Sequence, residues 1–518
     1  MNDSADTSSL ADPAEWLERA ARTQPRRLFL STPAGRRLTY AELAEHCARY
    51  AAALAACGVQ PGDRVAVWVE KSPEAIVLYV ACLAAGAVLV PINVASSLSE
   101  LEHFLEDSRP RLAVVRPASR ESLTPLLERI GVPCVETLAA DGAGTFAEKA
   151  ACVAYGLPRL RAPASNDLAA LVYTSGTTGR SKGAMLTRGN LVSNAAALAA
   201  AWRFSCEDVL LHTLPLFHVH GLFAAINTVL ASASSLVLLP RFDAGAVIEL
   251  LADATVLMGV PTHYARLLAD GRLDRRASAR VRLFVSGSAP LLAETHQAFF
   301  ERTGHRILER YGMTETLMNT SNPYEGPRVP GSVGPALPGV EVRVTERASG
   351  GVLSEPEAIG ALEVRGPNVF AGYWRDPEKT RAAFTADGWF RTGDLGRIDA
   401  AGYVYLVGRA KDLVISGGHN VYPREVEIEL DAVPGVLESA VFGVPHPDFG
   451  EGVTAVVVLA PGASVTEVEL IEALRPRLAR YKVPKRLFLV AELPRNPMGK
   501  VRKEALRVTY ADLYASGR

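Results

Sequence analysis

The segment YTSGTTGRSKG, at 173–183, combines hydroxyl groups, glycines and two cations in a pattern suited to binding phosphate. Glycine removes side chains that would block a ligand and lets backbone N–H groups converge on an anion. Lys182 adds a mobile positive charge. The candidate donors lie in a loop made of Thr174, Ser175, Gly176, Thr177, Thr178 and Gly179.

This loop differs from the Walker A motif, in which Gly-Lys-Ser/Thr opens a helix. Here Ser181 precedes the lysine and Gly183 follows it. Clusters of Ser, Thr and Gly also form ordinary polar turns. The density of donors beside Lys182 favours phosphate binding over a turn that binds nothing.

The composition argues against several classes of partner. The 518 residues carry 55 basic and 56 acidic side chains, a net charge of −1, and no basic run that would suit nucleic acid or an anionic membrane. The six cysteines include no CxxC pair, which fits neither a zinc framework nor a disulfide scaffold. The first residues lack the features of a signal peptide. We therefore expect a cytoplasmic protein with no nucleic-acid and no membrane partner.

Two uncharged stretches, 75–99 and 211–240, are long enough to raise the question of membrane spans. Gly86 and Pro91 interrupt the first, and Pro215 and two histidines interrupt the second. Each divides into a helix followed by a strand, so we expect buried elements of an α/β domain.

Amphipathic helices alternate with short apolar strands up to about residue 240. For example, Val65–Val69 predicts a strand, and Ser72 and Pro73 are typical of the start of the next helix. The strand LAALVY, at 168–173, leads directly into the glycine-rich loop. Strand, loop and helix in this order indicate an α/β sheet that binds its ligand at the end of a strand.

The pattern changes in the last third of the chain. Residues 331–408 contain short strands separated by Gly and Pro turns, which predicts a β-rich subdomain. A charged segment follows, and then a small α+β unit. We place a domain boundary near 409–412, which gives a large N-terminal domain, 1–408, and a small mobile C-terminal domain, 409–518.

Further motifs follow the loop in a fixed order: SGSAPL (286–291), YGMTET (311–316), TGD (392–394), Arg409 and PRNPMGK (494–500). Each alone has an ordinary structural interpretation. Together they resemble the acyl-adenylate-forming superfamily over almost the whole chain. PLFHVHGLF (215–223), ATVLMGVPTHYARLL (254–268), RLFVSGSAPLL (282–292), ERYGMTETLMNTSNPY (309–324) and KDLVISGGHNVYP (411–423) look like the malonyl-CoA synthetases of that superfamily.

The resemblance implies a two-step reaction that uses ATP, Mg²⁺ and coenzyme A. A carboxylate attacks the α-phosphate of ATP, and the CoA thiol then displaces AMP. Placed donors and cations must stabilise the charge on the phosphoryl oxygens. In the ATP site, the resemblance implies that the 174–182 loop binds the β- and γ-phosphates, that Thr314 contacts phosphate and that Glu315 binds Mg²⁺. It implies adenine contacts by Ser288, Ala289 and Tyr311. Asp394 would bind the ribose, and Arg409 would support the nucleotide.

The C-terminal domain is expected to rotate between the two steps. The resemblance places the hinge at Lys411, the passage for the pantetheine arm of CoA at Gly417 and Gly418, and the bridge between α-phosphate and substrate carboxylate at Lys500. It also implies control by a lysine acetyltransferase and deacetylase acting on Lys500, because acetylation would remove the charge.

Malonate and methylmalonate have a second carboxylate, which stays ionised when the first reacts with ATP. Burying this second carboxylate requires a cationic partner. Arg282 shares a strand face with Ser286, which points it toward the SGSAPL loop. Arg266 alone is more typical of a surface arginine. The resemblance implies a clamp of Arg266 and Arg282, with His220 beside it, Ser286 in the substrate site and His218 where the acyl group joins the adenylate.

Three alternatives stay open. A ligase for a fatty or aromatic monocarboxylic acid would need apolar side chains in place of the arginines. A peptide-synthetase adenylation domain fits less well, because no carrier-domain segment follows and its substrate-reading pattern is not evident. A nucleotide-binding regulator without catalysis is disfavoured by Lys500, Glu315 and Asp394.

Overall fold

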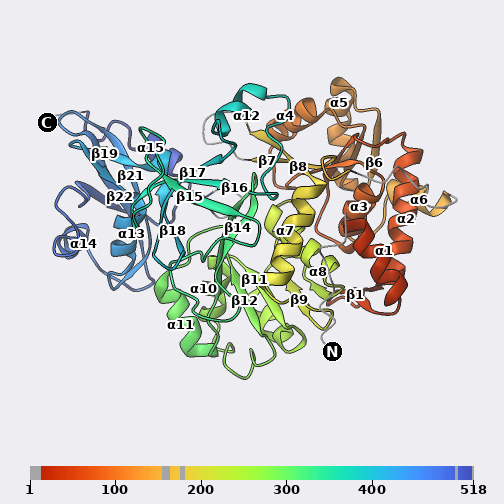
Figure 1. Cartoon of the computed structure of the whole chain (residues 1–518), viewed down its shortest axis with the longest axis horizontal. Coiled ribbons are helices and arrows are strands. Elements are labelled where there is room, and N and C mark those ends of the chain that lie inside the picture. Colours follow the sequence, from red (N-terminus) through yellow and green to blue (C-terminus); the bar gives the residue numbers. More distant parts are fainter. Residues whose placement is uncertain (1–12, 154–163, 175–180, 496–499, 516–518) are drawn as a thin grey trace. The chain divides into compact units, whose positions relative to one another are not determined.

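The computed structural model of the chain describes residues 13–153, 164–174, 181–495 and 500–515, and Figure 1 shows their helices and strands. The chain forms two compact units. The two observed units are groups of residues that pack compactly with one another. The predicted boundary at 409–412 instead separates two domains that are expected to move relative to each other, so that boundary stays a prediction. The first unit comprises Met1–Val342 and Val364–Phe390, and the second comprises Arg343–Glu363 and Arg391–Arg518.

A six-stranded sheet in the first unit carries the predicted phosphate loop. Its order is β6-β5-β3-β4-β7-β8, and all neighbours are parallel except β7 and β8. Apolar side chains on both faces are buried, as a parallel sheet requires. The strands are β3 (Arg64–Trp68), β4 (Val88–Pro91), β5 (Leu112–Val115), β6 (Cys134–Thr137), β7 (Leu168–Thr174) and β8 (Lys182–Thr187).

An eight-stranded sheet forms the rest of the first unit's framework, in the order β14-β13-β12-β11-β9-β10-β1-β2. Its inner strands are parallel, so their carboxyl ends meet at one edge, where α/β sheets bind ligands. The strands are β1 (Leu28–Ser31), β2 (Arg37–Thr39), β9 (Val209–His212), β10 (Ser235–Leu238), β11 (Val256–Gly259), β12 (Leu283–Ser286), β13 (Leu308–Met313) and β14 (Leu317–Ser321).

Helices pack on these sheets, and α7 (Arg188–Ala201) contacts strands of both (Figure 1). As predicted, Ser72 caps α3 (Pro73–Ala84), where its side chain accepts a hydrogen bond from the Ala75 N–H. The other helices are α1 (Pro13–Thr23), α2 (Tyr40–Ala56), α4 (Leu98–Ser108), α5 (Arg120–Ile130), α6 (Thr145–Cys152), α8 (Asn227–Ala231), α9 (Ala244–Leu250), α10 (Pro261–Ala269), α11 (Ala293–Thr303) and α12 (Pro377–Ala383).

The two uncharged stretches fold as predicted. The first contains α3 and β4, and the second contains helical turns followed by β10, all with mostly buried side chains. Within the described residues, none of the helices has the length and apolar character that crossing a bilayer would demand.

The predicted β-rich segment forms a four-stranded sheet in the order β15-β16-β17-β18, and most residues of these strands belong to the second unit. A further sheet, β20-β19-β22-β21 with β23 beside β22, has α13 and α14 packed on one face and α15 on the other. The elements are β15 (Glu341–Thr345), β16 (Gly360–Arg365), β17 (Phe390–Ile398), β18 (Val404–Arg409), β19 (Val414–Ser416), β20 (His419–Val421), α13 (Pro423–Asp431), β21 (Val436–His446), β22 (Gly450–Leu459), α14 (Glu467–Leu474), β23 (Arg486–Leu489) and α15 (Lys503–Thr509).

Candidate active site

The two strands that flank the predicted phosphate loop form an antiparallel pair, in which Thr174 lies opposite Lys182. Helix α4 fixes the backbone beside the lysine, because His103 Nε2 on that helix lies 2.7 Å from the Ser181 carbonyl oxygen. The start and end of the loop are therefore fixed next to each other. The predicted loop residues Ser175, Gly176, Thr177, Thr178 and Gly179 lie outside the described part of the chain, so their role stays a prediction.

Lys182 and Glu315 are brought together by an aromatic residue that the sequence did not single out. The Lys182 Nζ atom lies 4.9 Å from the centroid of the Tyr373 ring. The Tyr373 hydroxyl donates a 3.1 Å hydrogen bond to Glu315 Oε1. One ring thus orients both the predicted phosphate-binding cation and the predicted metal-binding carboxylate. The residues that surround Tyr373, AGYWRDP, offer no pattern that would have identified it.

Glu315 and Thr314 lie on the tight turn between β13 and β14. Leu317, with a φ of 52°, reverses the chain there, and the Glu315 carbonyl accepts the Phe370 N–H at 2.8 Å. The Glu315 side chain is buried, and the Thr314 side chain is half-buried. A carboxylate oxygen is a hard ligand of the kind that Mg²⁺ combines with substrate phosphates. The donor set at this turn therefore fits the predicted Mg²⁺ role of Glu315.

The SGSAPL loop begins where β12 ends, and its backbone is strained. Ser288 has a φ of 69°, which is unfavourable for any residue other than glycine and recurs at functional sites. Its hydroxyl lies 3.4 Å from His220 Nδ1. Ala289 is exposed, and Tyr311 on the neighbouring β13 is buried with its hydroxyl 4.0 Å from the Met313 sulfur. The predicted adenine contacts thus lie on adjacent strand ends.

The histidine motif enters a π-helix, His220–Ile226, a rare conformation that is frequent at functional sites. The backbone approaches itself closely there, because a Cβ on Gly221 would lie 2.1 Å from the Pro215 carbonyl oxygen. Burial, and then the charge of Arg310, hold the pKa of His220 well below its usual range. His220 is therefore neutral at physiological pH. His218 precedes the helix and packs on Phe217, with ring centroids 4.5 Å apart.

Lys71 supports this histidine segment from the end of β3. Its Nζ atom donates a 2.9 Å hydrogen bond to the His212 carbonyl, and His212 Nε2 lies 2.8 Å from the Gly221 carbonyl. Burial lowers the pKa of His212 to about 3, so the neutral ring must donate through Nε2 to that carbonyl. Lys71 therefore holds the strand end that positions the residue after His220.

Arg310 on β13 is the buried cation that sequence reasoning missed. Its guanidinium lies directly over Gly287, where an added Cβ would be 2.5 Å from its Cζ atom. Among the described residues, its Nε and Nη2 atoms have no hydrogen-bond partner, and burial lowers its pKa to about 9. A buried guanidinium without a carboxylate is costly. The only signal in the sequence is a charge inside a strand next to Tyr311.

Buried polar atoms without partners gather around these strand ends. Within the described part of the chain they include His220 Nε2, Ser286 Oγ and the two nitrogens of Arg310. Such groups are normally satisfied in proteins, so each needs an explanation. A ligand that carries acceptor oxygens would supply partners for the guanidinium and the hydroxyl at once.

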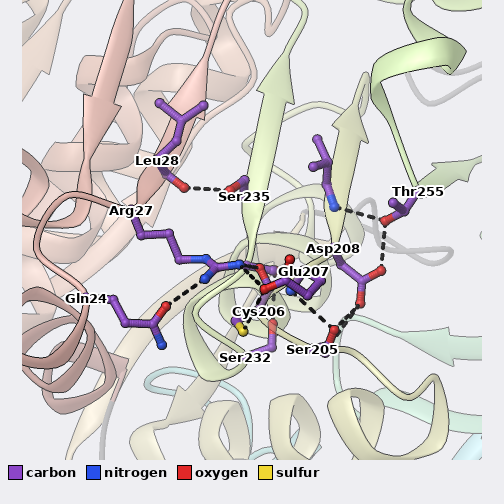
Figure 2. Close-up of polar contacts among 12 residues, drawn as sticks. Gln24, Arg27, Leu28, Ser205, Cys206, Glu207, Asp208, Ser232, Ser235 and Thr255 are labelled. Carbon is purple, nitrogen blue, oxygen red and sulfur yellow. Dashed lines mark hydrogen bonds and ion pairs between the residues drawn. The ribbon is translucent and has the colours of Figure 1, made fainter.

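The structure corrects the prediction for Arg282, which lies at the amino end of β12 and therefore at the end remote from the SGSAPL loop. Its Nε and Nη2 atoms bind the two carboxylate oxygens of Asp208 at 2.7 and 2.8 Å, and it also donates to the Trp202 and Arg203 carbonyls. Figure 2 shows the same carboxylate receiving hydrogen bonds from Ser205 and Thr255. Arg282 is thus already fully engaged in a structural ion pair.

Arg282→Ala is therefore expected to destabilise the first unit by about 3–5 kcal/mol without changing acid selectivity. Asp208 is buried, and losing its partner would leave an uncompensated charge. Urea unfolding measures the stability, with the exposed Arg266→Ala as the matched control, for which a change within about 0.5 kcal/mol is expected. Lost malonate selectivity at unchanged stability would instead restore the carboxylate clamp.

The same ion pair gives a direction for pH dependence. Burial raises the pKa of Asp208, but hydrogen bonds from Arg282, Ser205 and Thr255 outweigh it, so the pKa is lowered overall. A carboxyl whose pKa is lower in the folded state stabilises the fold above its unfolded pKa, and this stabilisation is lost as pH falls through the folded pKa. The difference in stability between wild type and Arg282→Ala should therefore shrink in acid.

Arg266 lies on α10 with an exposed side chain. Burial and then the charges of Arg266 and Lys71 lower the pKa of His263 to about 3, so Arg266 lies close to that ring. The ring itself stacks on Phe242, with centroids 3.9 Å apart. The structure shows no shared site for Arg266 and Arg282 among the described residues.

Asp394 and Arg409 face each other across β17 and β18 in the second unit, with Arg409 Nε 2.7 Å from Asp394 Oδ1. Lys411 lies in a short 3₁₀ turn, Ala410–Asp412, and burial lowers its pKa. Gly417 and Gly418, with φ values of 60° and 78°, form the turn between β19 and β20. Lys500 is exposed. Their expected roles stay predictions.

Comparisons with known proteins show the family of this chain. The profile of AMP-binding enzymes matches residues 17–374, and that of the AMP-binding enzyme C-terminal domain matches 425–500. The mitochondrial malonate–CoA ligase of Mus musculus is 39% identical over 491 residues, which cover 88% of this chain and 82% of that protein. Feruloyl-CoA synthase of an Amycolatopsis species is 37% identical over 499 residues, covering 95% and 98%.

The crystal structure of ATP-bound MatB from Rhodopseudomonas palustris is similar throughout. It is 52% identical and has a TM-score of 0.93, with coverage of 97% of this chain and 99% of that one. The first profile alone spans more than half of the chain, and it contains the loop, Glu315 and Arg310. The chain therefore belongs to the family of AMP-binding enzymes.

Proposed function

We propose that this chain is a malonate–CoA ligase. In the first step, a carboxylate oxygen of malonate attacks the α-phosphate of ATP, and pyrophosphate leaves. In the second step, the CoA thiol attacks the acyl carbon of malonyl-AMP, and AMP leaves as malonyl-CoA forms. The proposal extends to methylmalonate, which has the same two carboxylates.

The observation that carries this proposal is the buried Arg310 beside Gly287, with no hydrogen-bond partner for two of its nitrogens among the described residues. Activation consumes one carboxylate of the acid. A dicarboxylate keeps a second one, which would neutralise this guanidinium, whereas a fatty or aromatic acid would leave it buried and uncompensated. Ser286 Oγ could donate to the same carboxylate, and neutral His220 adds no competing positive charge.

The relatives support the same choice without deciding it alone. One of them is named as a malonate–CoA ligase and another as a feruloyl-CoA synthase, which activates an aromatic monocarboxylic acid, and their identities are close, 39% and 37%. Sequence similarity therefore leaves an aromatic acid as the alternative. The buried cation favours the dicarboxylate.

The remaining residues take the roles that the family resemblance implies. The 174–182 loop and Thr314 would hold phosphate oxygens, and Glu315 would hold Mg²⁺, which supplies positive charge to those oxygens. Tyr373 keeps Glu315 in place through its 3.1 Å hydrogen bond. Groups that are held in place before the reaction do not have to reorganise when charge develops during phosphoryl transfer.

In the second unit, we propose that Asp394 accepts the ribose hydroxyls, Arg409 supports the nucleotide and Lys500 bridges the α-phosphate and the acid. Lys411 would be the hinge, and Gly417 and Gly418 would line the path of pantetheine. Lys500 is exposed and so accessible to an acetyltransferase. Its acetylation would remove the charge and stop adenylation. We also propose a cytoplasmic location, which the cysteine usage supports.

Product analysis tests the proposal. Purified protein with malonate, ATP, Mg²⁺ and CoA should form malonyl-CoA, AMP and pyrophosphate in equal amounts. Without CoA, malonyl-AMP should accumulate on the enzyme. Formation of ADP and inorganic phosphate, or pyrophosphate release without any thioester in the presence of CoA, would reject it.

Lys71→Met is expected to raise the KM for malonate roughly tenfold while leaving the KM for ATP unchanged. Its Nζ atom holds the His212 carbonyl, and the His212 ring holds the segment after His220. Steady-state kinetics with each substrate varied in turn measures the KM for malonate and the KM for ATP separately. Lys71→Arg, which keeps a donor, should recover part of the loss. Equal losses for malonate and ATP would assign Lys71 a general structural role instead.

A further inference from the structure

A cluster of four chemically active side chains lies in the first unit, outside the site described above. Cys57 caps the carboxyl end of α2, Cys134 and Glu136 lie on β6, and Lys149 lies on α6. We call these four residues the thiol cluster. Cys57 and Glu136 are buried, and Cys134 is half-buried.

Both thiols of the cluster converge on one carboxylate oxygen. The sulfur of Cys57 lies 3.9 Å from Glu136 Oε1, and the sulfur of Cys134 lies 3.8 Å from the same atom. The two sulfurs and a Glu136 oxygen all lie within 4.8 Å of one another. Two cysteines far apart in the sequence are thus held nearly in contact.

Lys149 completes the cluster with a positive charge. Its Nζ atom lies 2.5 Å from Glu136 Oε1 and 3.5 Å from the Cys57 sulfur. Burial raises the pKa of Glu136, but the hydrogen bonds from Lys149 and Thr145 and the charge of Lys149 together outweigh it, so the pKa is lowered overall and the carboxyl is ionised. The ammonium therefore occupies the position that a cation bound by Glu136 would take.

Two thiols and a carboxylate also form a ligand set for zinc, but the cluster fits that use poorly. Structural zinc takes four protein ligands, whereas the described residues here offer three. A metal would also have to displace the ammonium from Glu136. The pair of neighbouring sulfurs is better suited to oxidation.

We propose that Cys57 and Cys134 form a redox-active pair that a hydroperoxide converts to a disulfide. The half-buried Cys134 sulfur attacks the peroxide, the O–O bond breaks, and Cys134 sulfenic acid and an alcohol or water result. The Cys57 sulfur then attacks the Cys134 sulfur, the S–O bond breaks, and hydroxide leaves. Glu136 takes the Cys57 proton, which passes to the hydroxide to give water.

The surroundings support this order of events. Burial, followed by the interaction with Cys134, raises the pKa of Cys57 to about 12, so Cys57 stays a thiol while the more accessible Cys134 reacts. A disulfide bond is about 2.05 Å long, so the sulfur atoms of Cys57 and Cys134 must move closer together to form one. Among the described strands, β6 lies at the edge of its sheet and pairs with β5 alone, which makes a small shift of Cys134 feasible.

Peptide mapping of the full chain after hydrogen peroxide treatment tests this proposal. Cys152→Ser and Cys206→Ser should be combined first, because these thiols are exposed or half-buried and would form adventitious bridges. The expected product is a Cys57–Cys134 cross-linked peptide that has lost two hydrogen atoms and is released by dithiothreitol. Oxidation should also raise the melting temperature, because the bridge closes a long loop.

Cys57→Ser and Cys134→Ser should each abolish the cross-link, and Cys82→Ser, a buried thiol outside the cluster, should retain it. The map of the Cys152→Ser and Cys206→Ser protein, with Cys57 and Cys134 intact, decides the matter alone if a variant of the cluster does not fold. Recovery of both thiols unmodified would overturn the proposal. A Lys149–Cys57 cross-link that has gained an oxygen atom would do so too, as would stoichiometric zinc in the purified protein.

Discussion

Lys500→Ala is expected to lower malonate-dependent pyrophosphate release by at least about 10²–10³-fold, the cost of removing one charge-stabilising donor from such a site. Thioester formation from supplied malonyl-AMP should continue at close to the wild-type rate. The reason is that the C-terminal domain, which carries Lys500, is expected to rotate between the two steps, so that Lys500 serves the first step. Separate assays of the two half-reactions measure the contrast.

Two controls sharpen this test. Lys379→Ala removes a surface lysine that pairs with Asp376, and it should change neither half-reaction. Lys500→Arg keeps the charge with a different shape, so partial recovery would show that charge matters more than geometry. Equal loss of both half-reactions in Lys500→Ala would mean that Lys500 has a general role in folding or in both steps.

Arg310→Met is expected to reduce kcat/KM for malonate by about 10²–10³-fold, and the melting temperature should stay the same or rise. Loss of the partner of a buried carboxylate costs about 3–5 kcal/mol, and 1.4 kcal/mol corresponds to a factor of ten. The free protein, however, loses a buried charge with no partner for two of its nitrogens among the described residues. Replacing such a charge with an apolar side chain of similar volume is often neutral or stabilising.

Opposite effects on stability and activity distinguish substrate binding from a structural role. Arg306→Met is the matched control, because Arg306 is exposed and close in sequence, and both readouts should stay unchanged. Monocarboxylic acids should lose nothing in Arg310→Met, and selectivity should relax toward them. Unchanged malonate kinetics, or a large loss of stability, would remove Arg310 from the substrate site.

Local patterns predicted the elements of this fold well. The Ser72 cap, the strand that leads into the glycine-rich loop and the β-rich segment all depend on residues close in sequence, and the structure contains them. The strand predicted at Val65–Val69 begins one residue earlier, at Arg64. Such patterns report backbone conformation and face, which neighbouring residues decide.

The residues of the candidate site depend on contacts between distant parts of the chain, and for them the sequence was a poorer guide. Period two suggested a strand face for Arg282, but it cannot reveal that Asp208, on another segment, binds two nitrogens of the guanidinium. Arg310 stands out only because the described residues around it supply no carboxylate partner. Tyr373 matters because the fold places it between Lys182 and Glu315. Each of these is a property of tertiary packing.

The most direct test of the malonate assignment is a comparison of kcat/KM values for thioester formation across acids. The series is malonate, methylmalonate, succinate, acetate, octanoate, benzoate and ferulate, each with ATP, Mg²⁺ and CoA. A site with a buried cation should prefer malonate or methylmalonate over every monocarboxylic acid by a factor on the order of 10² or more. Preference for octanoate, benzoate or ferulate would contradict the account and leave Arg310 without a role in substrate choice.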